Sequence, residues 1–284
     1  MRTYSDFWRS LTAIYEESEA RSIASLVMER CLGMTLTDIC MGNDDKMTEA
    51  DYDRLHGIKE RLLSSEPVQY IIGEECFRGH VYHVSPGVLI PRPETAALVD
   101  WIVDDFSARK STEGMRLLDC CCGSGCISIE MKYEFPDMQV EGLDIAEEAI
   151  LATEINARNI GVEVKVFKDD VLAPVYIEGT YDCIVSNPPY VCNFEKQQMR
   201  ANVLDWEPAV ALFVPDDNPL LFYEAITDMA VSALKDGGSL YFEINPLFVQ
   251  EMEQMLVSKG MVDVIVNESQ QYNNRMMRAM KPLD

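Results

Sequence analysis

The sequence has few of the residues that usually bind metals, and it has no apolar run long enough to cross a membrane. It contains only three histidines, and its nine cysteines include no repeated Cys-x-x-Cys pair, so we expect no metal site. No stretch approaches about 18 consecutive apolar residues. The N-terminus is charged and polar where a signal peptide would be apolar. We therefore expect a cytoplasmic protein that is neither exported nor embedded in a membrane.

Positive charge is also scarce. Lysine and arginine number 24 against 48 aspartates and glutamates, which gives a net charge of −24. Proteins bind nucleic-acid backbones mainly through Lys and Arg side chains that displace counterions, so this composition disfavours a nucleic-acid substrate. It favours small molecules, or a protein partner that presents a basic surface.

The nine cysteines are an odd number, and the three at Cys120–Cys122 are consecutive. Adjacent side chains on a strand point to opposite faces of the sheet, so this run cannot converge on one metal ion. We expect free, buried thiols in a reducing compartment.

The length of 284 residues allows one large domain or two modest ones. Residues 1–72 show helical periodicity without strand alternation, and we expect a small helical domain that recognises the substrate. Its candidate N-caps are Thr35, Thr37 and Thr48, and a capping box from Thr48 to Asp51 predicts a helix over 49–64. Residues 66–73 are predicted to be a linker opened by Pro67. Residues 73–90 predict a β-hairpin linker, with a turn at Pro86-Gly87.

Residues 91–284 alternate between apolar strands and helices. Such alternation predicts a doubly wound, mostly parallel sheet that binds ligands at the carboxyl ends of its strands. The last two strands are expected to form a closing antiparallel hairpin. The expected strands are 115–119, 140–144, 162–167, 181–186, 239–244, 262–266 and 275–281, and the expected helices are 96–106, one that ends near 134, 146–159, 220–234 and 246–259.

A glycine-rich turn follows the first strand of this region. Asp119 ends the strand, and Gly123 and Gly125 permit positive φ and a close approach of a ligand to the backbone. The turn is neither G-x-G-x-x-G, because residue 128 is serine, nor a P-loop, because no Gly-Lys-Ser/Thr follows. It is weak evidence for a nucleotide-like ligand by itself.

Carboxylates at the ends of the next two strands strengthen that interpretation. Asp144 lies about 20 residues after the turn, where a carboxylate can grip ribose hydroxyls; the alternative is a cap for the following helix. Asp169 or Asp170 could bind an adenine amino group, or the pair could be a solvated loop. Dinucleotide binding and adenosyl-sulfonium binding both remain open on these residues.

The run Asn187-Pro188-Pro189-Tyr190 follows the fourth strand and favours a methyl acceptor site. Pro188 has no backbone N–H, and two prolines stiffen the loop, so carbonyl oxygens can face a bound NH₂ group. The Asn187 side-chain carbonyl can accept a second hydrogen bond from that group. Tyr190 offers a flat face to a planar amide or base.

These motifs resemble class I S-adenosylmethionine-dependent methyltransferases that act on planar NH₂ acceptors. The segments 67–73, 89–95 and 207–212, in this order and after a helical domain, narrow the resemblance to the HemK/PrmC family of release factor glutamine N5-methyltransferases. The resemblance covers nearly the whole chain. It implies a Rossmann-like methyltransferase domain that uses S-adenosyl-L-methionine to methylate the side-chain amide of the glutamine in the Gly-Gly-Gln motif of peptide chain release factors.

The resemblance also implies roles for the residues. Asn187 and the Pro188 carbonyl would hold the acceptor NH₂, Pro189 would line that site, and Tyr190 would pack on the amide. The cofactor would contact Asp119, Gly123, Gly125, Asp144, Asp170 and Asn187. The sequence departs from the family pattern at Cys121-Cys122, where Gly or Thr is commoner, and at Ala96, where Glu is usual.

Three other functions remain as alternatives. The enzyme could methylate a glutamine of a ribosomal protein, or it could be an adenine N6-methyltransferase of nucleic acid that flips its base into the same pocket. It could also be a non-catalytic adaptor, although the intact Asn187–Tyr190 run argues against that. For any of the enzymes we expect a monomer.

Overall fold

The structure is a computed structural model that describes residues 3–174, 181–267 and 275–283. The chain divides into two compact units. The smaller unit comprises Met1–Glu74 together with Arg200–Trp206, and the larger comprises Glu75–Met199 and Glu207–Asp284. Within the described residues, no helix has the length and apolar character needed to cross a membrane.

The smaller unit is helical, as predicted. Its core is a cluster that includes Phe7, Leu11, Val27 and Leu55, all fully buried. Its elements are α1 (Tyr4–Leu11), α2 (Glu17–Leu32), α3 (Leu36–Cys40), η1 (Asn43–Lys46), α4 (Glu49–Leu63), α5 (Val68–Ile72) and, from the later segment, α9 (Ala201–Leu204).

The predicted caps of this unit are confirmed at two threonines and wrong at one. Thr35 and Thr48 each form a capping box, at the starts of α3 and α4 respectively. Thr37 lies inside α3, because the helix already begins behind Thr35. The linker predicted over residues 66–73 is also wrong, because Pro67 occupies the N-cap of α5 and its fixed φ starts this short helix.

The segment 200–206 groups with the smaller unit through specific contacts. The Arg200 guanidinium donates to Glu19 at 2.8 Å, and the Trp206 indole N–H donates to the carbonyl of Ser64 at 3.1 Å. Nothing in the hydrophobic pattern of residues 91–284 signalled this grouping, because both contacts link positions far apart in the sequence.

The larger unit begins with the hairpin of β1 (Glu74–Phe77) and β2 (His80–His83). Its tight turn is at Arg78-Gly79, where both residues have positive φ, whereas Pro86-Gly87 makes a separate turn beyond the hairpin. Glu130, farther along the same unit and only 1% exposed, accepts hydrogen bonds from Tyr82 and from His80, each at 2.8 Å. This buried carboxylate therefore fastens the hairpin to the rest of the unit.

A seven-stranded sheet forms the centre of the larger unit, in the order β10-β11-β9-β6-β3-β4-β5. The strands from β5 to β9 are parallel, and β11 and β10 add the predicted antiparallel hairpin at one edge. The sheet strands are β3 (Arg116–Cys120), β4 (Gln139–Asp144), β5 (Lys165–Lys168), β6 (Tyr181–Ser186), β9 (Leu234–Glu243), β10 (Val262–Val266) and β11 (Met276–Met280).

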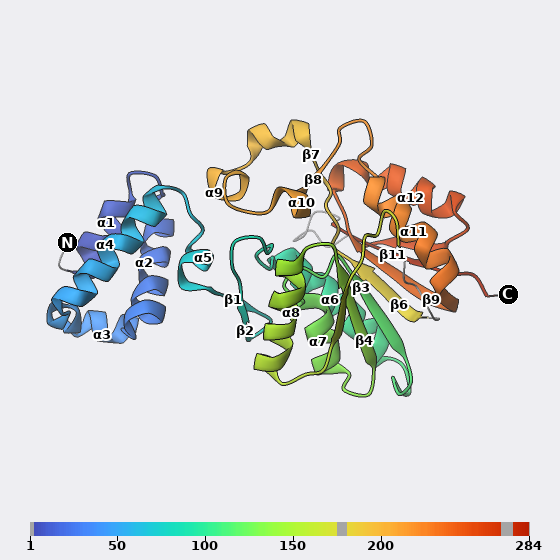
Figure 1. Cartoon of the computed structure of the whole chain (residues 1–284), viewed down its shortest axis with the longest axis horizontal. Helices are drawn as coiled ribbons and strands as arrows, with labels where there is room; N and C mark the ends of the chain where they lie inside the picture. The colour runs from blue at the N-terminus through green and yellow to red at the C-terminus, as the bar shows by residue number, and fades with distance from the viewer. Residues whose placement is uncertain (1–2, 175–180, 268–274, 284) are drawn as a thin grey trace. The chain divides into compact units, whose positions relative to one another are not determined.

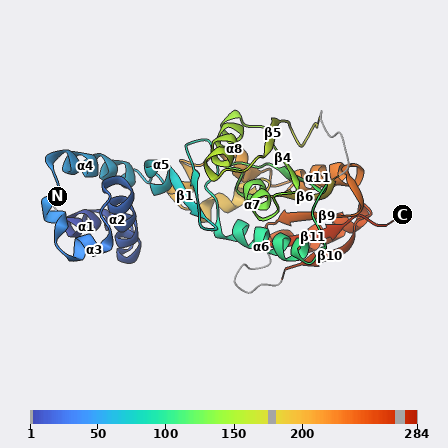
Figure 2. The same ribbon diagram turned by 90° about the horizontal axis from the view of Figure 1, so that it is seen from below.

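Helices cover both faces of this sheet, as Figures 1 and 2 show. On one face α6 (Pro93–Ser107), α7 (Cys126–Glu134) and α8 (Glu147–Ile160) pack on side chains such as Leu117 and Val185. On the other, α11 (Leu221–Ala233) and α12 (Val249–Ser258) pack on side chains such as Leu118 and Ile184. Successive residues of a strand thus serve opposite layers, which confirms the predicted doubly wound α/β class.

The remaining short elements are β7 (Val191–Cys192), η2 (Asn193–Gln198), α10 (Ala209–Leu212), β8 (Phe213–Val214) and η3 (Pro246–Phe248). One strand boundary differs from the prediction for a clear reason. β9 begins at Leu234 rather than Ser239, because its pairing with β6 shifts register across Gly237-Gly238. Gly237 has φ +72°, so the pair of glycines forms an irregularity within the strand rather than a turn before it.

Candidate active site

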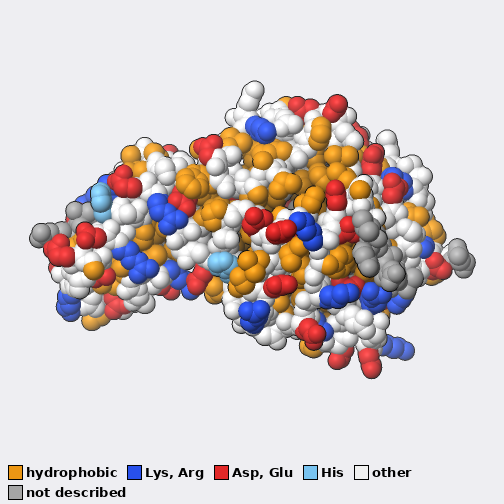
Figure 3. Space-filling model, in the orientation of Figure 1, with side chains coloured by type: hydrophobic (Ala, Val, Ile, Leu, Met, Phe, Trp, Pro, Cys, Tyr) orange, Lys and Arg blue, Asp and Glu red, His pale blue; other side chains and the backbone are white. Residues whose placement is uncertain are grey.

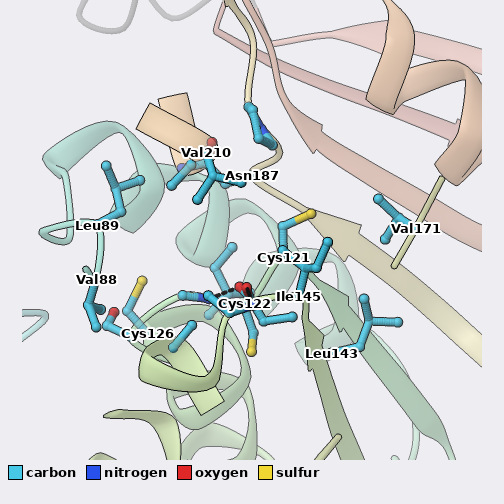
Figure 4. Close-up of a pocket in the computed structure, with 18 of the residues that line it drawn as sticks. Val88, Leu89, Cys121, Cys122, Cys126, Leu143, Ile145, Val171, Asn187 and Val210 are labelled. Atoms are coloured by element: carbon cyan, nitrogen blue, oxygen red, sulfur yellow. Dashed lines mark hydrogen bonds between the residues drawn. The ribbon is translucent and has the colours of Figure 1, made fainter. Parts of the chain in front are cut away.

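A cavity lies at the carboxyl ends of the central strands of the larger unit, where loops follow β3, β4 and β6. In the sheet, β4 and β5 lie on one side of β3, and β6 and β9 lie on the other side. The strand order therefore reverses at β3, and open α/β sheets bind ligands at such a switch point. Figure 4 shows Asn187 and Val210 near each other, with Val88, Leu89 and Cys126 on one side and Leu143, Ile145 and Val171 on the other.

The glycine-rich turn forms one wall of this cavity through an unusual backbone. Cys121, Gly123 and Gly125 all have positive φ, at +60°, +57° and +78°. A Cβ on Gly125 would lie 2.5 Å from Cγ2 of Thr153, which is too close for any side chain, whereas a Cβ on Gly123 would meet nothing within 4 Å. Gly125 is thus required by packing against α8, and Gly123 leaves open space beside its backbone.

Asp144 holds the turn from the end of β4. Its two carboxylate oxygens accept the backbone N–H groups of Gly123 and Ala146, each at 2.9 Å. Of the two roles that the sequence left open, the cap of the following helix is not formed, because Ala146 is the N-cap of α8 and no side chain caps that helix. Asp144 lines the cavity, where its contact with a ribose remains a prediction. Burial raises the pKa of the Asp144 carboxyl, and the backbone N–H groups oppose that shift.

Asp119 lies behind the turn and is fully buried. One oxygen accepts the backbone N–H of Ser128 at 3.0 Å, while Oδ1 has no partner among the described residues. Burial, the largest cause, raises the pKa of this carboxyl to about 7, and the nearby charge of Asp144 adds to the shift.

Asn156 on α8 joins the turn to the hairpin. Its amide donates to the carbonyls of Ser124 and His83, and its own carbonyl accepts the backbone N–H of His83 at 2.7 Å. All of its hydrogen-bonding groups are used while the residue is completely buried. Sequence reasoning missed Asn156, because its partners lie on two segments distant from it in the chain.

Apolar side chains on the β4 and β5 side of the cavity are unusually accessible. Ile145 is 47% exposed and Leu172 is 43% exposed, and both line the cavity with the buried Val171. Asp169 and Asp170 line it as well, and an oxygen of Asp170 accepts the backbone N–H of Leu172 at 2.9 Å. Exposed apolar faces beside polar acceptors suit a planar, partly polar ligand.

All nine cysteines are free, as predicted, although Cys40 and Cys76 are exposed rather than buried. Cys121, Cys122 and Cys126 line the cavity. Burial raises the pKa of each of these thiols well above its usual range, so they are neutral at physiological pH. No group of His, Cys, Asp or Glu in the described ranges is arranged to hold a metal ion.

The Asn187–Tyr190 run follows β6 on the opposite side of the cavity. Asn187 and Pro189 line the cavity, whereas Pro188 and Tyr190 are not among its lining residues. The Tyr190 hydroxyl donates to Glu243 at 2.9 Å, and its ring packs beside the hydrophobic core under α11 and α12. The rigid loop therefore presents Asn187 to the cavity while its tyrosine is tied to the interior.

Two buried residues support this loop. Sequence reasoning named the segment that ends at Thr95 without giving that residue a role, and it missed Glu243. Thr95, at the start of α6, donates its hydroxyl proton to Oε2 of Glu243 at 2.6 Å, and the Asn187 amide donates to the same hydroxyl oxygen at 3.1 Å. Glu243 ends β9 and is 1% exposed. Burial raises its pKa, and the hydrogen bonds from Thr95 and Tyr190 oppose that shift.

Asn245, two residues beyond Glu243, fixes the loop a second time. Its amide donates to the carbonyl of Tyr190 at 3.1 Å and to Glu195 at 2.9 Å. Tyr190 is thus held at its hydroxyl by Glu243, which ends β9, and at its carbonyl by Asn245 just beyond the strand. The apolar pattern identified this strand, but it gave no sign that the polar residues at the strand's end reach the Asn187–Tyr190 loop.

The segments 89–95 and 207–212 meet at the entrance of the cavity. The Arg92 guanidinium pairs with Glu207, and the backbone N–H of Ile90 donates to the same carboxylate at 3.4 Å. Glu207 is buried, and Val210 beyond it is 55% exposed where it lines the cavity. The Glu207 carboxylate is buried and the Arg92 side chain is partly exposed, and this pair joins two lining segments that are far apart in sequence.

The structure brings together five of the nine residues predicted for the site. Those that line the cavity are Gly123, Asp144, Asp170, Asn187 and Pro189. The other four are not among the lining residues: Asp119 lies in β3, Gly125 in the turn that follows it, and Pro188 and Tyr190 in the loop after β6.

Comparison with known proteins identifies the family. Residues 7–73 match the family described as PrmC N-terminal domain, and residues 97–205 match the Methyltransferase small domain. A release factor glutamine methyltransferase of Bacteroides thetaiotaomicron is 44% identical over 259 residues, which is 91% of each chain. The chain belongs to the release factor glutamine methyltransferase family. Another such methyltransferase, of Flavobacterium psychrophilum, is 33% identical over 96% of this chain and 95% of its own.

A solved structure agrees with the methyltransferase fold. The 16S rRNA N2 methyltransferase of T. thermophilus, in complex with AdoMet and guanosine, aligns with this chain at 17% identity and a TM-score of 0.53. The alignment covers 74% of this chain and 50% of that methyltransferase. At this identity the likeness concerns the fold alone. Membership of this family and the Rossmann-like fold of the larger unit confirm the family and the fold that the sequence motifs predicted.

Proposed function

We propose that this enzyme transfers a methyl group from S-adenosyl-L-methionine to the side-chain amide nitrogen of the glutamine in the Gly-Gly-Gln motif of peptide chain release factors. The observation that carries the proposal is the position of Asn187, which reaches the same cavity as Gly123 and Asp144. An amide-binding side chain and a nucleoside-binding wall thus share one space.

The residues of the cavity fit S-adenosylmethionine. Each Asp144 oxygen uses one acceptor position on a backbone N–H, and a carboxylate has about four such positions, so capacity remains for ribose hydroxyls. Ile145 and Leu172 would flank the adenine, with Asp170 beside its amino group. Gly123 and Gly125 would lie along the methionine part, and Asp119 would support that loop from behind.

The loop opposite would hold the acceptor. Asn187 and the Pro188 carbonyl would each accept a hydrogen bond from the glutamine NH₂, Pro189 would line its path, and Tyr190 would pack on the amide plane. Two acceptors on one NH₂ fix the direction of the nitrogen and leave its lone pair above the amide plane.

The chemistry needs orientation more than it needs a base. Bound S-adenosylmethionine supplies a strongly electrophilic methyl group. The amide nitrogen is a weak nucleophile because its lone pair is delocalised, so holding it in line with that methyl lowers the barrier. Asn187 and the Pro188 carbonyl favour the positive charge that develops on nitrogen, after which an amide proton leaves to water. The neutral thiols near the cavity are not required as nucleophiles.

The charge and the domain pattern support three further parts of the proposal. A net charge of −24 favours a basic protein partner over direct contact with nucleic acid. Figure 3 shows Lys and Arg side chains in small groups among acidic and hydrophobic ones on the face that it views. We also propose that residues 1–72 recognise the release factor, with 73–90 as a linker to the catalytic domain 91–284, and that the enzyme acts as a cytoplasmic monomer.

Mass spectrometry of candidate substrates tests the proposal. The enzyme and S-adenosylmethionine are incubated separately with an intact release factor, with ribosomal proteins and with an adenine-containing duplex. We expect a gain of one methyl group only on the release factor, in the peptide that contains Gly-Gly-Gln. A release factor in which that glutamine is replaced by alanine serves as the control. Methylation of a ribosomal protein or of DNA in place of the release factor would contradict the proposal.

A further inference from the structure

The Thr95 hydroxyl lies between the acceptor-binding residue and a buried carboxylate. It is 2.6 Å from Oε2 of Glu243 and 3.1 Å from the amide nitrogen of Asn187. Thr95 is 2% exposed, although it is one of the residues that line the cavity, and Glu243 is 1% exposed. The three side chains come from α6, the loop after β6 and the end of β9.

With Glu243 ionised, a count of protons sets the direction of the hydrogen bonds among Glu243, Thr95 and Asn187. An ionised carboxylate can only accept, and Glu243 receives the protons of Thr95 and Tyr190 on its two oxygens. Burial, the largest cause, raises the pKa of Glu243, whereas the hydrogen bonds from Thr95 and Tyr190 and the positive charge of Arg275 favour the ionised form. With its only proton donated to Glu243, the Thr95 oxygen can accept but not donate.

The consequence falls on Asn187. Only the NH₂ end of its amide can donate to the Thr95 oxygen, so its carbonyl must point away from Thr95. Asn187 lines the cavity, and this carbonyl is therefore the end available to a ligand there. An asparagine free to rotate could present either end, because its O and N atoms are nearly the same size.

We propose that Thr95 and Glu243 are positioning residues that fix the Asn187 amide with its carbonyl directed at the acceptor NH₂. This inference rests on the proposed function, because it concerns a substrate that must donate a hydrogen bond. Without Thr95, the Asn187 NH₂ can turn toward the cavity, where it would oppose the substrate NH₂. Neither Thr95 nor Glu243 needs to touch the reacting atoms for this effect.

Thr95→Val tests the inference, because valine keeps the shape and removes the hydroxyl. We expect kcat for the release factor to fall on the order of tenfold, with little change in KM. The Kd for S-adenosylmethionine, measured by calorimetry, should stay unchanged. Thr95→Ser keeps the hydroxyl and should recover most of kcat. Thr227→Val is the matched control, because the Thr227 hydroxyl is equally buried but donates only to the carbonyl of Tyr223 in α11.

A double-mutant cycle separates positioning from general support of the fold. If Thr95 acts only through Asn187, Thr95→Val should reduce the activity of Asn187→Ala by less than about twofold. The same tenfold loss in both backgrounds would overturn the inference, as would full activity of Thr95→Val or failure of Thr95→Ser to recover it. If the wild-type enzyme does not methylate the release factor, the proposed function fails; if only the Thr95 effects are absent, the function stands and this inference fails.

Discussion

The two loops that enclose the cavity are stabilised in different ways. The turn at residues 121–125 is shaped by its backbone, through positive φ at Gly123 and Gly125 and through the backbone N–H of Gly123, which donates to Asp144. The Asn187–Tyr190 loop is held instead by buried side chains from distant segments, above all Thr95 and Glu243. The cofactor side thus depends on its own backbone conformation together with Asp144 and Asn156 of the next strand and helix. The acceptor side depends on buried polar side chains from segments much farther away in the sequence.

The largest expected effect is on the acceptor side. Asn187→Ala should reduce single-turnover methyl transfer by about 10²–10³-fold, the range for loss of one group that stabilises transition-state charge. The Kd for S-adenosylmethionine should change little, because the side chain addresses the acceptor NH₂. Rapid-quench assays and calorimetry on the same preparation measure both quantities. Near wild-type turnover would show that the loop does not bind the acceptor.

Gly125→Ala should destabilise the glycine-rich turn on the cofactor side of the cavity. The added Cβ would overlap Thr153 and would be strained at φ +78°. We expect the free energy of unfolding to fall by about 3 kcal/mol, from overpacking of 1–3 kcal/mol and left-handed strain of 1–2 kcal/mol. Gly123→Ala carries the strain without the clash, so it should lose only about 1–2 kcal/mol. Urea denaturation measures both variants, and equal losses would show that the Thr153 contact does not matter.

Asp144→Ala should weaken S-adenosylmethionine binding by about 1.5–3 kcal/mol, the range for a hydrogen bond to a charged group. This corresponds to roughly a 10- to 100-fold rise in Kd. Asp144→Asn keeps one acceptor oxygen and should lie between alanine and the wild type. If a calorimetric titration gives the same Kd for Asp144→Ala and the wild type, Asp144 only supports the loop and the following helix.

Asp119 predicts a pH dependence of stability. Its pKa is raised from 3.8 to about 7, so between about pH 4 and pH 7 the folded state binds more protons than the unfolded state. Stability therefore falls as the pH rises through this window, and the loss is complete above it. Asp119→Asn cannot ionise, so its free energy of unfolding should fall less between pH 5 and pH 8. Equal slopes for the two proteins in urea denaturation would refute this assignment.

The smallest effect is expected at Cys121, a non-glycine residue with φ +60°. In Cys121→Gly, relief of left-handed strain should offset the greater entropy of the unfolded chain, so stability should stay within about 0.5 kcal/mol of the wild type. Cys122→Gly serves as the contrast, because Cys122 is buried and is not strained in this way. It should lose about 1–2 kcal/mol. A large loss at Cys121 would show that its packing outweighs its backbone strain.

The sequence predicted the parts of the site whose signals are local. Gly123 and Asp144 stand out because a turn and a strand end are each visible within a few residues, and the strands at 181–186 and 262–266 match the structure at both ends. Periodicity also identified the helical unit. It missed the short helix α5, because Pro67 was interpreted as the start of a linker and a proline can equally cap a helix.

The sequence could not predict contacts that join distant segments. Thr95 and Glu243 are 148 positions apart, and although Thr95 ends a segment that resembles the family, nothing in the sequence pairs it with Glu243. The same holds for Arg200 with Glu19 in the smaller unit. Polar contacts of this kind are set by the packing of whole elements, whereas hydrophobic patterns determine only which elements form.

The identity of the atom that receives the methyl group tests the central claim most directly. S-adenosylmethionine with a ¹³C-labelled methyl group is supplied with a release factor whose glutamine side chains carry ¹⁵N. We predict that NMR of the product will show a one-bond coupling between the new methyl carbon and the side-chain nitrogen of the Gly-Gly-Gln glutamine. A labelled methyl group without that coupling, on oxygen, carbon or another residue, would contradict the account.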